Sequence, residues 1–194
     1  MSFGSWEVNI QTSKFPQKVA TALAKFEEEP RFGAEYEGVA YLGSQTVNGT
    51  NHAVLAIQTI LNGKDTQNYV LLIFQEKPGS EELSVPTIER VMEGGEALGG
   101  TKLNFQTEIP EEAQKAFDQG FAEFVGSAVK PKALLATKMT KGMNYAFLAE
   151  LTPTAAAPAT KAEIVFVNAM TKERAFFDLL NSKAQTALGY AFNW

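Results

Sequence analysis

Residues 49–56 read GTNHAVLA and residues 142–149 read GMNYAFLA, so one eight-residue pattern occurs twice, at an offset of 93. Three such matches in one order and in nearly constant register predict a duplicated domain of about 95 residues. Because two copies are too few for a solenoid, we expect each copy to have its own core. The other two matches pair Asn9-Ile10-Gln11-Thr12 with Asn104-Phe105-Gln106-Thr107, and Phe15-Pro16 with Ile109-Pro110.

The connection between the copies is predicted in residues 93–100, which read EGGEALGG. Four glycines in eight residues are typical of a flexible link. We therefore predict two domains, residues 1–97 and residues 98–194. The chain of 194 residues is long enough for two small domains of this size.

Each copy is predicted to contain a strand, one helix and then an antiparallel meander. Pro16 and Pro110 suit the first turn of a helix, and apolar residues at helical spacing follow each of them. These are Val19, Ala22, Leu23 and Phe26 in the first copy, and Ala113, Phe117, Phe121 and Phe124 in the second. Strand-like runs follow at 37–47, 53–60, 69–74 and 83–92. The expected class is α+β, with one helix packed across a four- to five-stranded antiparallel sheet in each domain.

Composition excludes several classes of function. The net charge is −5, which argues against a nucleic-acid partner. The chain has no cysteine and one histidine, His52, so a thiolate site, a multi-histidine metal site and a cysteine nucleophile are all impossible. No motif indicates a cofactor, a metal or an enzyme. No stretch has the length of a membrane span or the pattern of a signal peptide, so we expect a cytoplasmic protein; a processed secreted form would have the same features.

The first copy has a glycine near its start, Gly4, the motif Gln45-Thr46-Val47-Asn48-Gly49 in its first predicted hairpin, and Pro78-Gly79 in a later turn. With these residues it resembles a cystatin of the cysteine-free stefin branch. That family has a glycine near its N-terminus, a Gln-x-Val-x-Gly motif in its first hairpin and a Pro-Gly second hairpin. The resemblance covers residues 1–92 and implies two tandem cystatin-like domains. It also implies reversible, non-covalent inhibition of papain-like cysteine proteases by a monomer or a hairpin-swapped dimer. The implied contacts are Gly4, Gln45, Thr46, Val47, Asn48, Gly49, Pro78 and Gly79.

The second copy departs from this motif. Lys138-Met139-Thr140-Lys141-Gly142 keeps only the glycine, so we expect a degenerate cystatin-like domain. Its C-terminal part shows helical spacing over 175–183 and strand alternation over 188–194.

Two other interpretations remain open for the first copy. The matching residues are also what ordinary hairpins and a chain terminus require, and fold does not imply function. The alternative function is a cystatin-fold module that binds another protein or peptide without inhibiting a protease.

Overall fold

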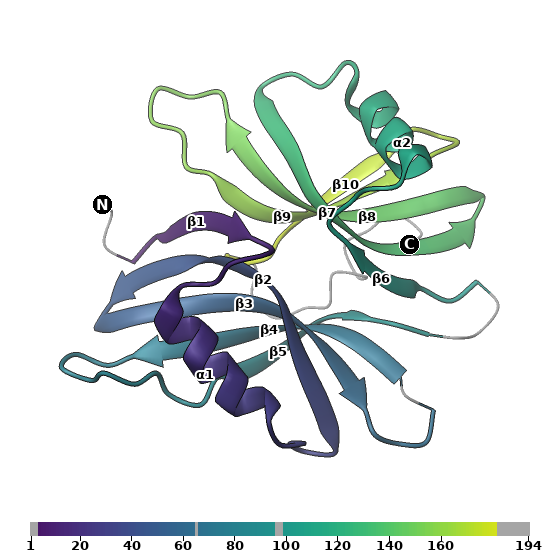
Figure 1. Cartoon of the computed structure of the whole chain (residues 1–194). Helices are drawn as coiled ribbons and strands as arrows, with labels where there is room; N and C mark the ends of the chain where they lie inside the picture. Colours follow the sequence, from purple (N-terminus) through teal and green to yellow (C-terminus); the bar gives the residue numbers. More distant parts are fainter. Residues whose placement is uncertain (1–3, 65, 96–98, 182–194) are drawn as a thin grey trace. The chain divides into compact units, whose positions relative to one another are not determined.

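The chain separates into two compact units, Met1–Met92 and Glu93–Trp194. The computed structural model describes residues 4–64, 66–95 and 99–181. The strand, helix and strand order of the first unit recurs in the second (Figure 1). The first series is β1 (Trp6–Gln11), α1 (Gln17–Glu27), β2 (Ala34–Val47), β3 (Gly49–Ile60), β4 (Thr66–Glu76) and β5 (Thr87–Glu93). The second is β6 (Lys102–Gln106), α2 (Glu111–Phe121), β7 (Ser127–Thr140), β8 (Gly142–Pro153), β9 (Lys161–Asn168) and β10 (Arg174–Asp178).

Each unit contains one five-stranded sheet. The strand order is β1-β2-β3-β4-β5 in the first sheet and β10-β9-β8-β7-β6 in the second. Strands β2 and β3 form a long antiparallel hairpin in which Val47 lies opposite Gly49, and His52 of β3 lies opposite Phe74 of β4. This register brings the loop after β2 and the loop after β4 to the same end of the first sheet.

The helices begin where the sequence predicts. Pro16 and Pro110 immediately precede α1 and α2, at positions where the missing N–H would have no partner within the helix. Val19, Leu23 and Phe26 of α1 are buried in one cluster with side chains of β2, β3 and β4. Ala113 and Phe117 of α2 are buried in the same way in the second unit. Within the described ranges, neither helix has the length and apolar character needed to cross a membrane.

The predicted fold class, α+β with two cystatin-like helix-across-sheet domains, is wrong. The described part of the chain is mostly β, with 53% strand and 13% helix, in two five-stranded antiparallel sheets. The physical reason lies in the lengths of the elements. Strands β2 and β3 have 14 and 12 residues and pair along nearly their whole length, whereas α1 has 11 residues, so backbone pairing between strands takes up most of the unit.

The helix predicted over 175–183 is also wrong. Residues 174–178 form β10, in which Phe176 lies opposite Val165 and Phe177 lies opposite Ile164 of β9. Four apolar residues in a short segment fit a helix and a strand about equally well. Only a strand can place the backbone N–H and C=O groups of this segment in hydrogen bonds with β9. The strand predicted over 188–194 lies outside the described residues.

Candidate protein-binding edge

The first hairpin loop, residues 45–51, is built by the ends of β2 and β3. Asn48 occupies its tip, between the paired residues Val47 and Gly49. Gly49 has φ +102°, a conformation that side-chain-bearing residues rarely adopt. Gln45 lies directly opposite Asn51, whose Nδ2 donates a hydrogen bond of 3.1 Å to Gln45 Oε1. This side-chain bond closes the base of the loop.

The N-terminal segment is tied to this loop by two hydrogen bonds. The Gly4 N–H donates to the carbonyl oxygen of Thr46 at 2.9 Å. The Gln45 Nε2 donates to the Gly4 carbonyl oxygen at 2.7 Å. The Gln45 amide therefore links Gly4 on one side with Asn51 on the other.

The second hairpin loop, residues 76–80, lies against the first. Its turn is closed by the Ser80 N–H, which donates to the Lys77 carbonyl oxygen at 3.0 Å, and Gly79 has φ +76°. A Cβ on Gly49 would lie 2.1 Å from the Glu76 carbonyl oxygen and 3.2 Å from Pro78 Cδ. The second loop therefore occupies the space in which a side chain at Gly49 would lie.

The structure places all eight predicted contact residues at this end of the first sheet. Gly4, Thr46, Asn48, Pro78 and Gly79 are exposed, and Gln45, Val47 and Gly49 are half-buried. We call these eight residues the wedge. They come from three segments that are remote in the sequence, and the contacts above join all three.

An ion pair beneath the wedge was not predicted from the sequence. Lys18 of α1 donates to Glu76 Oε1 at the base of the second loop. The other Glu76 oxygen, Oε2, lies 3.6 Å from His52 Nε2, and His52 Nδ1 lies 3.2 Å from the Tyr41 hydroxyl. The hydrogen bond from Lys18 lowers the pKa of Glu76, and burial lowers the pKa of His52. The glutamate is thus held as an anion that anchors the loop to the helix.

No sequence pattern identifies this group, because residues 18, 52 and 76 belong to three different elements. Only the pairing of β3 with β4 and the packing of α1 bring them together. His52, the single histidine of the sequence, is half-buried.

The second unit carries a different arrangement at the equivalent end. Asn144, the counterpart of Asn51, donates to Thr140 Oγ1 at 3.1 Å and accepts from Asn168 Nδ2 at 2.6 Å. Asn168 also fixes the loop after β9 by accepting from the N–H groups of Met170 and Thr171. Two methionines at this end are exposed, Met139 at 57% and Met170 at 69%. A buried amide pair therefore joins the two loops here, and Lys138 stands where the first unit has Gln45.

The wedge offers shape and backbone hydrogen-bonding groups to a partner. It contains no acid, histidine or cysteine, and Lys77 is the one charged residue between Glu76 and Gly79. Among the described residues, no group of three or more metal-ligating side chains is placed to hold a metal ion. Comparison of the chain with protein-family models, with curated proteins and with solved structures gave no match.

Proposed function

We propose that the wedge binds in the active-site cleft of papain-like cysteine proteases and inhibits them reversibly, without covalent chemistry. The observation that carries this proposal is the convergence of Gly4, the first hairpin loop and the second hairpin loop at one end of the first sheet. These are the three segments in which the sequence resembles the inhibitory motif of the cystatin family. The proposal rests on the motif and on this convergence, and it does not require a cystatin-like domain architecture.

The physical chemistry of the wedge supports tight, non-covalent binding. The bonds from Gly4 to Thr46 and from Gln45 to Gly4 hold the N-terminal segment and the first loop together before any partner arrives. Such pre-organisation reduces the entropy lost on association. Val47 offers a half-buried, stiff apolar side chain, and Gly4 has no side chain to obstruct a close approach of a second backbone.

The test is an inhibition constant for the full chain against papain, measured with variants of the wedge. Val47→Asp should raise that constant about thirty-fold or more, because a central interface residue commonly contributes about 2 kcal/mol and a buried charge must be desolvated. Gly4→Glu should also weaken inhibition, for two reasons: its φ of +84° is strained for a residue with a side chain, and a Cβ there meets nothing within 4 Å in the free protein and so is open to the partner.

The matched control is Thr140→Asp, which introduces the same charge at the equivalent hairpin position of the second unit, 93 residues later. This control should leave papain inhibition unchanged. Absence of papain inhibition by the unmodified chain would overturn the proposal. If papain is bound but remains active towards its substrate, the wedge is a binding module and not an inhibitor.

A further inference from the structure

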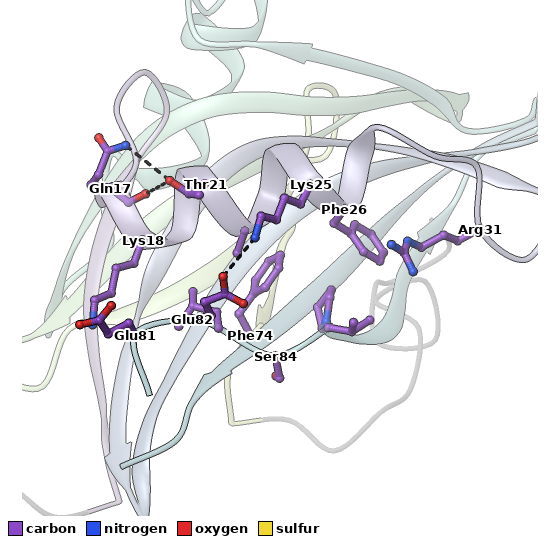
Figure 2. A pocket seen from close by; sticks show the side chains of 14 residues that line it. Gln17, Lys18, Thr21, Lys25, Phe26, Arg31, Phe74, Glu81, Glu82 and Ser84 are labelled. Atoms are coloured by element: carbon purple, nitrogen blue, oxygen red, sulfur yellow. Dashed lines mark hydrogen bonds and ion pairs between the residues drawn. The ribbon is translucent and has the colours of Figure 1, made fainter. Parts of the chain in front are cut away.

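The first unit contains a hollow that the wedge does not use. It lies between α1 and residues 81–86, which lead from β4 towards β5, and its volume is about 380 Å³ (Figure 2). None of the eight wedge residues lines it. This volume falls at the lower end of the range for small-molecule pockets.

The inner wall of the pocket is apolar and rigid. Phe26 of α1 and Phe74 of β4 line it, with ring centroids 6.4 Å apart and ring planes at 85°. Both rings are almost fully buried in the core of the unit, so they form the fixed inner wall of the pocket and present little of their own surface. Ala22, Leu83, Val85 and Pro86 complete the apolar lining, and of these Ala22, Leu83 and Val85 are at least partly exposed. A flat apolar group would find preformed contacts here.

Three basic side chains line the pocket, and two of them already have acidic partners. Lys18 is paired with Glu76, and Lys25 Nζ lies 3.4 Å from Glu82 Oε1. The third, Arg31, has no ion pair with any described residue. In Figure 2 the remaining acidic lining residue, Glu81, is drawn at the other end of the pocket from Arg31.

Arg31 is placed to receive an anion. Its guanidinium lies over the Phe26 ring, 5.2 Å from the centroid, and its Nε is buried without a hydrogen-bond partner in the described structure. A buried N–H without an acceptor is unfavourable and uncommon, so an acceptor from a ligand would satisfy it. Guanidinium Nε and terminal N–H groups bind carboxylates in a paired, planar geometry.

We propose that this pocket binds a small aromatic monocarboxylate. The ring of the ligand lies beside Leu83 and Val85 above the inner wall of the pocket, and its carboxylate accepts hydrogen bonds from the Arg31 guanidinium. A dicarboxylate is disfavoured, because Glu81 and Glu82 line the part of the pocket away from Arg31.

Calorimetric titration of the full chain with naphthylacetate and with its uncharged amide, naphthylacetamide, tests the proposal. The acid should bind at least tenfold more tightly than the amide. Equal affinity of the two compounds, or no binding of the acid at millimolar concentration, would overturn the proposal. This comparison uses the unmodified protein and therefore does not depend on any variant folding.

Three variants locate the binding. Arg31→Gln should reduce affinity for the acid at least tenfold and leave affinity for the amide nearly unchanged. Ala22→Phe should abolish binding of both compounds by filling the pocket. Lys64→Gln removes an exposed positive charge of the same unit outside the pocket and should change neither affinity. If Arg31→Gln and Lys64→Gln bind the acid equally well, Arg31 does not hold the carboxylate and the proposal is wrong.

Discussion

At Gly49 both the backbone conformation and the packing require glycine. Its φ of +102° is strained for any residue with a side chain, and its missing Cβ is what allows the second hairpin loop to lie against the first. The neighbouring Gln45 has a comparable role through its amide, which bonds Gly4 and Asn51 at once. The wedge therefore depends on a few residues whose chemistry cannot be exchanged.

Gly49→Val should lower the free energy of unfolding by about 2 kcal/mol or more, because backbone strain and a clash with the Glu76 carbonyl oxygen act together. Chemical denaturation measures this change. Gly63→Val is the matched control: Gly63 has φ +78°, but a Cβ there meets nothing within 4 Å. Gly63→Val therefore measures the effect of backbone strain without a clash. If Gly49→Val lowers the free energy of unfolding no more than Gly63→Val does, the two hairpin loops are not in the contact described.

At the scale of elements, α1 is held to its sheet by three buried side chains. Phe26 contributes the largest of them, with its ring 5.0 Å from the Tyr36 ring and 6.4 Å from the Phe74 ring. The apolar spacing that predicts this helix is the same spacing that buries it, because one stripe of side chains faces the strands. Sequence periodicity therefore predicts α1 well. For β10 the spacing of apolar residues predicted a helix, whereas pairing with β9 makes the segment a strand.

Phe26→Ala should lower the free energy of unfolding by about 3–5 kcal/mol, since it leaves a cavity between α1 and β4. The same substitution at Phe32, which is 92% exposed, should have little effect on the melting temperature. Thermal unfolding of the two variants in parallel checks this. Similar melting temperatures would mean that α1 does not depend on its apolar stripe for attachment.

At the scale of the whole molecule, one buried carboxyl group couples stability to pH. Glu163 of β9 is 4% exposed and lies directly opposite Asp178 of β10, whose Oδ2 is 3.3 Å from Lys161 Nζ. Burial, with a smaller contribution from the Asp178 charge, raises the pKa of Glu163 from 4.5 to about 7. Between pH 4.5 and about 7, Glu163 therefore keeps its proton in the native protein but has lost it in the unfolded chain.

The contribution of Glu163 to stability should consequently fall as pH rises from about 4.5 to 7, because ionisation of its buried carboxyl group opposes the native state. Glu163→Gln should unfold with a higher free energy than the unmodified chain at pH 8, by roughly 3 kcal/mol at most, and the difference should shrink towards pH 5. Denaturant unfolding at a series of pH values measures it. Glu123→Gln, an exposed position, is the control. A constant difference between Glu163→Gln and the unmodified chain across this range would contradict the assignment.

The duplication, the two helices, the long first hairpin and the wedge residues are all visible in the sequence. Each is a local property: a repeated pattern, a proline before a helical stripe, or a glycine at a positive φ. The bond from Gln45 to Gly4, the ion pair of Lys18 with Glu76 and the buried position of Glu163 are not visible there. They join residues that are remote in the chain, and only strand register and helix packing set their distances.

The sequence by itself determined where the helices begin, where the chain turns and which copy carries the Gln-x-Val-x-Gly motif. The tertiary structure alone decided that the protein is mostly β, because how far a strand extends depends on the strands with which it pairs and not on the spacing within it. It also decided that Arg31 lies over Phe26 at the end of a pocket. Periodicity acts within a segment, whereas sites form where segments meet.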